Sequence, residues 1–495
     1  MKIAPVLLVL FAFPFPAQPQ GASQPIRLDP RNPHYFLYDG KTIALITSGE
    51  HYGSVMNADF DYHKYLATLA ADGLNYTRIF GGSYVEVPGK SFGIQRNTLA
   101  PAPNRLILPW ARSAEPGYAG SGNKFDLGQW DPEYFRRLRD FLGQAQRLGI
   151  VVEISLFSSQ YGEPQWKFSP FYASNNVNQT SVSDYKKLNT LDNGDVLAFQ
   201  ERYVRKFVDE VNEFPNVIFE IQNEPWSDHP VLTDIVNPYL FPPQRDQYPN
   251  SIEVADDASI AWQTRVAGWI TSEESALKHK HLIAQCYSNF RLPVRTPIAG
   301  VSIVNFHYAY PEAASWNNGL GKAIAYDETG FLGGGDDAYR RQAWNFMLSG
   351  GSAFDALDYS FTTDHPDGSD TAPNGPGGGS AAFRKQLGIL AKFLSSFPLT
   401  QMKPDPQAAV HAGGAVARAL SSYTGLYAIY LDGKGPDRIS LSLIPGTYSV
   451  TWLDPKTGES RTGPTITSRG DDILIDTPPF ENGIAFSLTR VYLQY

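Results

Sequence analysis

The stretch VIFEIQNEPW, residues 217–226, is an apolar run that ends in polar residues and a proline. A run of this length that contains Val, Ile and Phe is typical of a buried β-strand. Two glutamates, Glu220 and Glu224, lie in it four residues apart, which is about 13 Å along an extended strand. Their roles therefore depend on which end of the strand lies at a functional surface.

The chain contains further runs of this type, with longer stretches of helical periodicity between them. Strands that are apolar on both faces belong to parallel sheets that helices cover. The predicted strands are 42–49, 74–82, 150–157, 217–224, 282–289, 301–308, 323–329 and 352–361, and the predicted helices include 59–73, 131–149, 194–214, 336–351 and 380–397. Eight strands that alternate with helices predict an α/β fold, a (β/α)8 TIM barrel, over residues 26–400.

The pattern changes after residues 398–406. Helical periodicity stops there, and short runs rich in β-branched and aromatic residues follow, separated by Gly, Pro and Asp turns. Short strands at this spacing are typical of an antiparallel sandwich. We therefore expect a small antiparallel β-sandwich, an accessory domain, over residues 404–495.

The N-terminus has the pattern of an export signal. A basic start is followed by the apolar run VLLVLFAFPFPA and then by small residues near Ala17 and Ala22. The run is too short to span a bilayer, and this order of features is that of a secretory signal. We expect residues 1–22 to be a cleaved signal peptide and the mature chain to be secreted or periplasmic. The single cysteine, Cys286, permits no intrachain disulfide.

Composition argues against several classes of partner. The formal net charge is −9, whereas nucleic acid selects basic protein faces. No polybasic segment is present to hold an anionic membrane surface, and no later run is apolar enough to span a bilayer. The prediction is a monomer with no cofactor, no nucleic acid partner and no membrane partner.

Two segments resemble metal sites but lack the full pattern. His279 and His281 have the spacing of a ligand pair, yet they precede a strand and have no set of acidic companions. The Asp-rich loop 364–370 does not have the spacing of the twelve-residue calcium loop. We predict no metal site, and calcium binding by residues 364–370 stays open.

In a barrel of this type the active site lies at the C-terminal ends of the strands. Six of the eight predicted strands end in polar or aromatic residues that would share this edge. They are Glu50, His51 and Tyr52 after the first strand, Arg78 in the second, Asn223 and Glu224 in the fourth, His307 and Tyr308 in the sixth, Asp327 and Glu328 in the seventh, and Asp358 and Tyr359 in the eighth. The sequence therefore predicts one polar ring around the barrel mouth.

Two members of this ring suit the cleavage of a glycosidic bond. That reaction needs one carboxyl group that protonates the leaving oxygen and one carboxylate that attacks the anomeric carbon. Different surroundings push the pKa values of two such groups apart. Glu224 and Glu328 are the predicted pair, about three strand–helix units apart. Glu220 would lie deeper in the barrel and pair with an interior partner.

The motifs IQNEPW and YDETG resemble clan A of the retaining glycoside hydrolases, which includes the cellulase and mannanase family 5. That clan has Asn-Glu-Pro at the end of the fourth strand and a glutamate at the end of the seventh. The resemblance covers about residues 26–400 and implies double displacement on a polysaccharide or oligosaccharide. The hairpin motif YSVTWLDPKTGE is similar to one in the β-sandwiches of apiosidase-like exported enzymes.

Residue by residue, the resemblance implies that Glu224 is the general acid/base and Glu328 the nucleophile. It implies that Asn223 hydrogen-bonds the 2-hydroxyl of the sugar. Arg78 is similar to the second-strand arginine that steadies the nucleophile. The segment FHYAY resembles the sixth-strand His-x-Tyr element, but here one tyrosine follows the histidine directly and another stands at Tyr310, so either could contact the nucleophile.

The predicted substrate contacts come from the same ring and from the segment after the fourth strand. They are Asn223, Arg78, His307, Tyr308, Trp226, His51, Glu50 and Tyr359. The family 5 histidine of the third strand and tryptophan of the eighth have no counterpart in the segments LFSSQYGEPQW and DYSFTTD. The sequence thus matches the clan more fully than the family.

Two other functions agree with the same barrel. One is a secreted carbohydrate-binding protein that no longer catalyses, which would bind glycans without hydrolysing them. The other is a metal-dependent hydrolase, for which the His and Asp set at the strand ends is missing. The identity of the sugar and the choice between internal and terminal cleavage stay open, because they depend on long loops after the second and third strands.

Overall fold

The computed structural model describes residues 24–234, 251–372, 375–411, 413–436 and 438–491. Eight parallel strands form a nearly closed barrel, in the order β4-β15-β14-β13-β12-β9-β8-β5. Their bounds are β4 (Leu45–Gly49), β5 (Tyr76–Phe80), β8 (Val151–Ser158), β9 (Val217–Asn223), β12 (Leu282–Asn289), β13 (Ile303–His307), β14 (Ala323–Glu328) and β15 (Ala353–Leu357). The predicted α/β barrel is confirmed, and each predicted strand overlaps one of these.

Between β4 and β5, hydrogen bonds from a single residue, Asn75, close the barrel. Asn75, just before β5, accepts a hydrogen bond from the backbone N–H of Ile46 at 2.9 Å and donates to the carbonyl of Ala44 at 2.9 Å. Its own N–H donates to the carbonyl of Ile46 at 3.2 Å. An amide side chain thus supplies the donor and acceptor that a strand ladder would provide at this seam.

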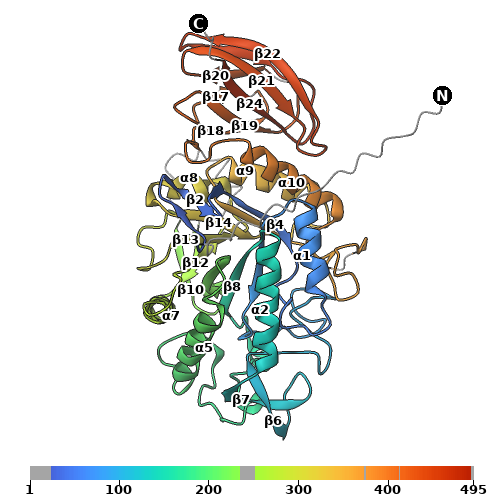
Figure 1. Cartoon of the computed structure of the whole chain (residues 1–495), viewed down its shortest axis with the longest axis vertical. Helices are drawn as coiled ribbons and strands as arrows, with labels where there is room; N and C mark the ends of the chain where they lie inside the picture. Colours follow the sequence, from blue (N-terminus) through green and yellow to red (C-terminus); the bar gives the residue numbers. More distant parts are fainter. Residues whose placement is uncertain (1–23, 235–250, 373–374, 412, 437, 492–495) are drawn as a thin grey trace, which may run out of the picture.

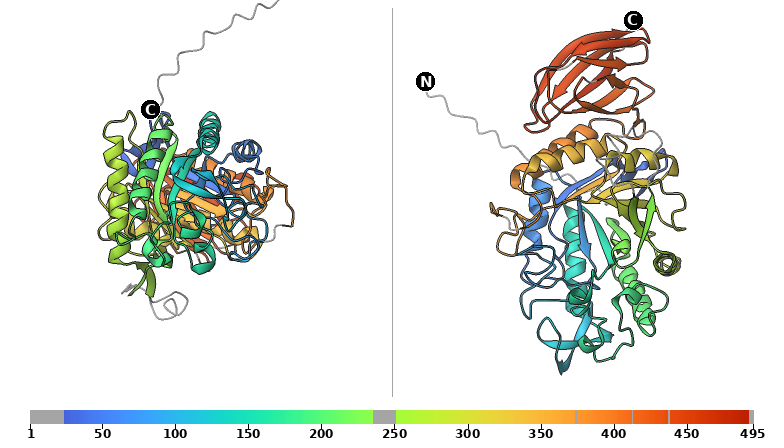
Figure 2. Two further views of the ribbon diagram at one scale, coloured as in Figure 1. Left: turned by 90° about the horizontal axis from the view of Figure 1, so that it is seen from below. Right: turned by 180° about the vertical axis from the view of Figure 1, so that it is seen from behind.

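Helices lie around the strands, as Figures 1 and 2 show. They are α1 (Tyr62–Ala71), α2 (Pro132–Arg147), α3 (Glu163–Trp166), α4 (Tyr185–Leu188), α5 (Val196–Val211), α7 (Asp257–Glu274), α8 (Pro311–Asn317), α9 (Asp336–Met347) and α10 (Ala381–Ser395). The connection from β12 to β13, residues 290–302, has no helix. Pro293 and Pro297 lie in it, and proline removes a helical donor and clashes with the preceding turn. One strand–helix unit therefore differs from the predicted regular repeat.

A small sheet covers the N-terminal end of the barrel. It consists of β1 (Arg27–Asp29), β2 (Asn32–Tyr38) and β3 (Lys41–Ile43). Phe36 and Tyr38 of β2 pack against the first residues of the barrel strands, such as Val151, Ile218 and Leu282. This apolar layer closes the bottom of the barrel, so the opposite end is the open one.

Two hairpins extend the connections between barrel strands, and the sequence does not predict them. One joins β6 (Trp110–Pro116) to β7 (Asn123–Trp130) between β5 and α2. The other joins β10 (Pro230–Asp234) to β11 (Ser251–Ala255) after β9. Residues 85–125, which the sequence presents only as a long loop, therefore hold part of a folded extension at the mouth side.

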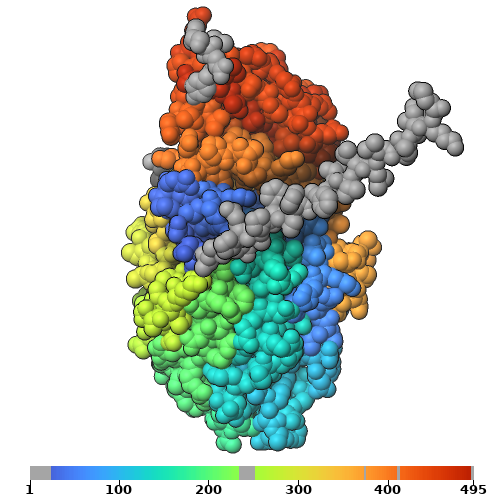
Figure 3. Space-filling view, in the orientation of Figure 1, coloured from blue at the N-terminus to red at the C-terminus, as the bar shows by residue number. Residues whose placement is uncertain are grey.

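The C-terminal part forms two antiparallel sheets around a second core, as predicted. The sheets are β16-β18-β19-β24-β21-β22 and β17-β20-β23. Their strands are β16 (Lys403–Pro404), β17 (Ala409–His411), β18 (Val416–Ser421), β19 (Leu426–Asp432), β20 (Arg438–Ser442), β21 (Gly446–Leu453), β22 (Ser460–Ser468), β23 (Asp472–Asp476) and β24 (Ile484–Val491). In Figure 3 this part is a separate lobe at one end of the molecule.

The β-sandwich packs on the barrel helix α9. Tyr430 of β19 stacks on Trp344 at a ring-centroid distance of 5.4 Å. Asp432 pairs with Arg341 at 2.5 Å and accepts a hydrogen bond from Asn345 at 2.8 Å. Aromatic stacking beside an ion pair fixes this helix to the sandwich.

Three further predictions concern the signal peptide, membrane-spanning segments and the single cysteine. The predicted signal peptide, residues 1–22, lies outside the described residues. Among the described helices, none combines the length and the apolar character that crossing a bilayer requires. Cys286 is a buried free thiol on β12.

Candidate active site

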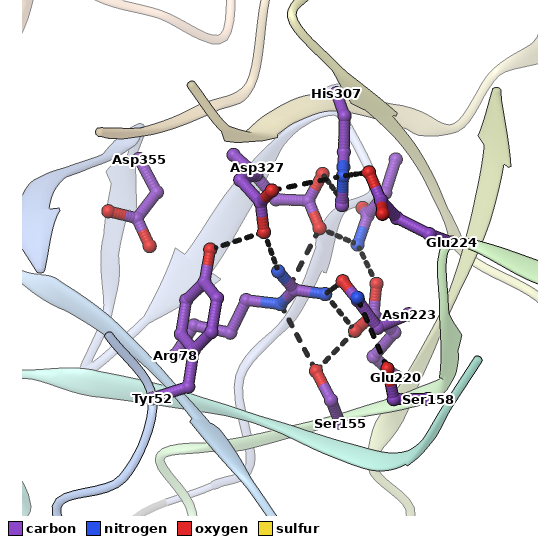
Figure 4. Close-up of polar contacts among 12 residues, drawn as sticks. Tyr52, Arg78, Ser155, Ser158, Glu220, Asn223, Glu224, His307, Asp327 and Asp355 are labelled. Atoms are coloured by element: carbon purple, nitrogen blue, oxygen red, sulfur yellow. Dashed lines mark hydrogen bonds and ion pairs between the residues drawn. The ribbon is translucent and has the colours of Figure 1, made fainter. Parts of the chain in front are cut away.

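The two predicted catalytic glutamates meet at the mouth of the barrel, where both line one cavity. Figure 4 shows Glu224 there, beside His307. Glu224 directly follows β9, and Glu328 is the last residue of β14, three strands further along the sheet. One carboxylate oxygen of each lies within 4.8 Å of the other and of a ring nitrogen of His307. Retaining glycosidases have carboxyl groups about 5–5.5 Å apart, whereas inverting ones need about 6.5–9.5 Å. The spacing fits direct attack by one carboxylate.

A β-bulge turns Glu328 into the barrel. Between β13 and β14 the register runs from Phe306 opposite Tyr326 to His307 opposite Glu328, so Asp327 is an extra residue. Side chains of a regular strand alternate between faces, and a bulge interrupts that alternation. Asp327 and Glu328 are therefore both available to the interior, which simple alternation excludes.

Three donors surround the carboxylate of Glu328. Tyr52 donates to Oε2 at 2.7 Å, Tyr308 donates to Oε1 at 2.8 Å, and the guanidinium of Arg78 lies 3.3 Å from Oε2. Burial would raise the pKa of Glu328, but the charges of His307 and Arg78 and the two phenol donors hold it below its ordinary value. This carboxylate is therefore ionised, as a nucleophile must be.

Of the two tyrosines that the sequence left open, Tyr308 contacts Glu328. Tyr310 instead stacks on Phe290 at 5.5 Å. Tyr52 is a second phenol donor that the sequence analysis did not assign to the nucleophile. Its position after the first strand beside Glu50 and His51 is the signal that pointed to this part of the mouth.

Glu224 has a different set of partners. Nδ1 of His307 lies 2.9 Å from Oε1, and the hydroxyl of Tyr161 donates to Oε2 at 2.8 Å. The same hydroxyl accepts a hydrogen bond from Asn223 Nδ2 at 2.7 Å. Burial lowers the pKa of His307, but Cys286, Glu328 and Asp327 raise it well above its ordinary value. Glu224 thus has a protein partner at each carboxylate oxygen, and its side chain is 13% exposed.

Glu220 occupies the layer below. Oε2 lies 2.5 Å from Nη2 of Arg78, and the same nitrogen lies 2.6 Å from Oδ1 of Asn223. Burial would raise the pKa of Glu220, but Arg78 lowers it. The expected interior partner of Glu220 is therefore Arg78, which joins this deep carboxylate to the nucleophile above it.

Other acids of this layer have raised pKa values, which favours their neutral form. Burial and the nearby charges of Glu220 and Asp327 raise the pKa of Glu153 to about 8. Burial also raises the pKa of Asp355 well above its ordinary value. Asn305 donates to Glu153 at 2.7 Å and to Asp327 at 2.8 Å. One guanidinium does not neutralise all these carboxyl groups, so several keep their protons.

Glu224 and Glu328 border an open cavity at the mouth, with about 360 Å³ of empty space including its opening to solvent. Its lining residues are His51, Tyr52, Phe80, Tyr84, Glu86, Phe92, Leu99, Tyr161, Asn223, Glu224, Tyr308, Glu328, Phe331 and Leu357. Apolar and aromatic walls with a few convergent polar groups are typical of small-molecule sites. None of the lining residues that the structure describes belongs to the β-sandwich.

The backbone around the cavity is strained. Tyr52, Tyr161, Glu224 and Tyr308 have φ values of 61°, 57°, 45° and 49°. Non-glycine residues in this left-handed region cost free energy, and such residues concentrate at functional sites. The strain directs three phenol hydroxyls onto the two glutamates.

Some predicted substrate contacts lie behind the cavity. Glu50 is fully buried and accepts backbone hydrogen bonds from Gly53 at 3.1 Å and Ser54 at 2.9 Å. Trp226 is 1% exposed and packs edge-on against His307 at 5.7 Å. In these positions the side chains of Glu50 and Trp226 pack behind the cavity and do not form its surface.

Of two further predicted contacts, His51 lies at the side wall of the cavity and Tyr359 lies behind it. His51 lines the cavity, and its Nε2 lies 3.2 Å from Oε1 of Glu86. Tyr359 is buried and stacks on His51 at 6.0 Å. Glu86 is not among the predicted contacts, because it lies inside the long loop after β5 and not at the end of a strand.

Two groups of potential metal ligands occur among the described residues, Glu220 with Cys286, His307 and Asp327, and Glu224 with His307 and Glu328. Both groups share His307. Arg78 already places a positive charge 2.5 Å from Glu220 and 3.7 Å from Asp327. A second cation there would meet electrostatic repulsion. The prediction of a site without metal stays a prediction.

No protein-family model and no curated protein sequence matches the chain. Solved structures match it in fold. A putative glycoside hydrolase from Bacteroides vulgatus has a TM-score of 0.62 at 12% identity, over 96% of this chain and 84% of that one. A glycoside hydrolase family 5 protein from the same organism has a TM-score of 0.60 at 10% identity, over 94% and 93%.

A third structure, described as a glycoside hydrolase, has a TM-score of 0.60 at 9% identity, over 94% of this chain and 97% of that one. The shared part is large enough to include the barrel and the C-terminal sheets in each case. The chain therefore has the fold of these glycoside hydrolases. Identity at this level shows the fold alone.

Proposed function

We propose that this protein is a retaining glycoside hydrolase that acts on the O-glycosidic bonds of a polysaccharide or oligosaccharide. The observation that carries the proposal is the pair of carboxylates, within 4.8 Å of each other and in unlike surroundings. Tyr52, Tyr308 and Arg78 hold Glu328 ionised. Glu224 lies at the mouth with His307 and Tyr161.

The proposed reaction has two steps. In the first, Glu328 attacks the anomeric carbon, the bond to the leaving oxygen breaks, and Glu224 gives that oxygen its proton. In the second, Glu224 takes a proton from water, the resulting hydroxide attacks the anomeric carbon, and Glu328 leaves. The sugar keeps its anomeric configuration because inversion occurs twice.

Substitution of each glutamate tests the roles. Purified Glu328→Gln and Glu224→Gln would be assayed on 4-nitrophenyl glycosides and on a panel of glucan, mannan, xylan and galactan. We expect kcat to fall by roughly 10²–10⁴-fold or more in each. An activated dinitrophenyl leaving group needs no acid, so it restores the first step of Glu224→Gln but not of Glu328→Gln.

The surface variant Glu213→Gln is the matched control and keeps wild-type kcat, because this exposed residue lies after α5. Near-wild-type turnover by Glu328→Gln contradicts the nucleophile assignment. Tight glycan binding by a wild-type protein that hydrolyses none of the panel favours the carbohydrate-binding alternative.

We also propose that the protein is exported and works outside the cytoplasm as a monomer. The apolar N-terminal run before Ala17 and Ala22 supports export. N-terminal sequencing of the protein secreted by its host tests this, and a mature chain that begins after residue 22 or close to it is the expected result.

A further inference from the structure

One side of the catalytic cavity is a fixed wall. The loop after β5 contributes Glu86 and Leu99 to the cavity lining. The hydroxyl of Thr98 donates to the carbonyl of His51 at 2.9 Å, and Nδ2 of Asn97 donates to Glu86 at 2.6 Å. Buried polar contacts of this kind rigidify a segment. The loop is therefore fastened to the residues that follow β4.

The wall continues into the loop after β15. Arg96 forms an ion pair with Asp370 and lies 3.4 Å from the carbonyl of Ala372. Behind His51, the ring of Tyr359 is covered by backbone, since a Cβ atom on Gly375 would lie 2.7 Å from that ring. The loops after β5 and β15 thus meet across β4. A sugar chain that lay across the mouth would run into them.

The rim of the cavity carries two exposed phenylalanines, Phe92 in the loop after β5 and Phe331 in the loop after β14. Phe92 is 41% exposed and Phe331 is 44% exposed, and they are the only phenylalanines of the described residues that are exposed. Phe92 packs edge-on against Tyr161 at 5.1 Å, and Phe331 packs edge-on against Tyr308 at 5.9 Å. Each ring therefore stands above the tyrosine that contacts one catalytic glutamate.

Both phenylalanines have left-handed backbones, with φ of 51° at Phe92 and 64° at Phe331. An apolar ring that is exposed to water forgoes the free energy of burial, and a left-handed backbone adds conformational strain. Each of these two residues therefore carries two free-energy costs. Flat apolar faces suit the faces of sugar rings, and burial by a ligand recovers the apolar contribution. These two rings are consequently placed to contact the part of a substrate that leaves the cavity.

We infer, on the basis of the proposed function, that the enzyme removes single sugar residues from chain ends. The terminal sugar occupies the cavity that Glu224 and Glu328 line. The wall at Arg96 and Asp370 blocks extension of the chain beyond that sugar. The leaving group, the next sugar of the chain, lies against Phe92 and Phe331.

Product analysis tests the inference. Wild-type enzyme would be incubated with borohydride-reduced pentasaccharides and with the parent glucan, mannan, xylan and galactan, and early products separated by chromatography. The expected products are a monosaccharide and the reduced tetrasaccharide from each pentasaccharide, and a monosaccharide with little loss of viscosity from each polymer. Oligosaccharides of several lengths with a rapid fall in viscosity overturn the inference but not the proposed function. Absence of any hydrolysis overturns both.

Variants at the rim provide the second test. Phe92→Ala and Phe331→Ala should each raise KM for the hydrolysed oligosaccharide by roughly tenfold, as for a lost aromatic contact. KM for the matching glycosyl fluoride should stay unchanged, because its leaving group is one atom. Leu332→Ala, an exposed neighbour outside the cavity lining, is the control and changes neither value. Equal effects on both substrates, or none, overturn the assignment.

Discussion

The two ends of the barrel interior are built from the same strands but from opposite kinds of residue. On β9, Ile218 lies in the apolar layer under the N-terminal sheet, and Glu220, two residues on, is buried against Arg78. Both layers are buried, yet only one holds charge. We call the layer of Glu220, which lies nearer the mouth, the upper layer, and the layer of Ile218, under the N-terminal sheet, the lower layer. Burial alone therefore does not select apolar residues, provided that every buried charge has a partner.

The upper layer is costly to build, and its arrangement shows what it provides. Arg78 contacts Glu220, Asn223 and Glu328, so one cation orders a deep acid, an amide and the nucleophile. In the lower layer, close packing provides stability without chemistry. Matched substitutions, one in each layer, should therefore separate the contribution to catalysis from the contribution to stability.

The largest expected effect follows Arg78→Leu. The change leaves Glu220 as a buried carboxylate without its cation, which costs about 3–5 kcal/mol of the free energy of unfolding. It also removes a cation that holds Glu328 ionised, so kcat should fall as well. Urea unfolding and steady-state kinetics measure the two effects.

Ile218→Ala, in another strand of the same barrel, is the matched control in the lower layer. It should cost about 2–5 kcal/mol, as large-to-small core substitutions do, while the folded fraction keeps its kcat. A variant at Ile218 that lost turnover as fully as Arg78→Leu would contradict the division between the layers.

A smaller effect is expected from Tyr52→Phe, which removes one donor from the nucleophile. A hydrogen bond to a charged group contributes about 1.5–3 kcal/mol, so kcat/KM should fall by roughly 10–100-fold. The pKa of Glu328 should rise, which moves the acidic limb of the kcat/KM profile to higher pH.

Tyr134→Phe is the control for that loss of a phenol. Its buried hydroxyl donates to the carbonyl of Gly81 at 2.9 Å, away from the cavity lining. It should reduce stability by about 1 kcal/mol and leave the pH profile in place. An unchanged acidic limb in Tyr52→Phe shows that Tyr52 does not act on Glu328.

A last effect concerns stability alone and is spread over several pH units, so it is the smallest at any one pH step. Burial raises the pKa of Glu153 to about 8 from the ordinary value of 4.5. Its stabilising contribution is full below pH 4.5 and is lost as the pH rises to about 8, by up to about 1.4 kcal/mol per pH unit. Glu153→Gln resembles the protonated form and should flatten this slope.

Urea unfolding at pH 5, 6, 7 and 8 measures the slope. Glu220→Gln is the contrasting variant in the same layer, because Arg78 keeps Glu220 ionised. It should lose stability throughout this range by leaving Arg78 without its closest carboxylate. Equal slopes in wild type and Glu153→Gln would mean that Glu153 is ionised in the folded protein.

Several features followed from local sequence. Apolar runs such as 217–224 predicted strands, and helical periodicity over 131–149 predicted α2 (Pro132–Arg147), because burial of one face is written into residue spacing. The position of Glu224 at a strand end followed in the same way. The absence of a helix in the 290–302 connection was also encoded locally, in Pro293 and Pro297. The count of strands did not take these prolines into account.

The tertiary structure decided which segments, far apart in the chain, come into contact. Tyr52 and Glu328 are 276 residues apart, and Arg78 and Glu220 are 142 apart. The bulge at Asp327, which lets Glu328 face inward, depends on the register with β13. Sequence periodicity reports only which face of an element is buried. The partner on that face, and the loop that closes the cavity, depend on how the elements pack.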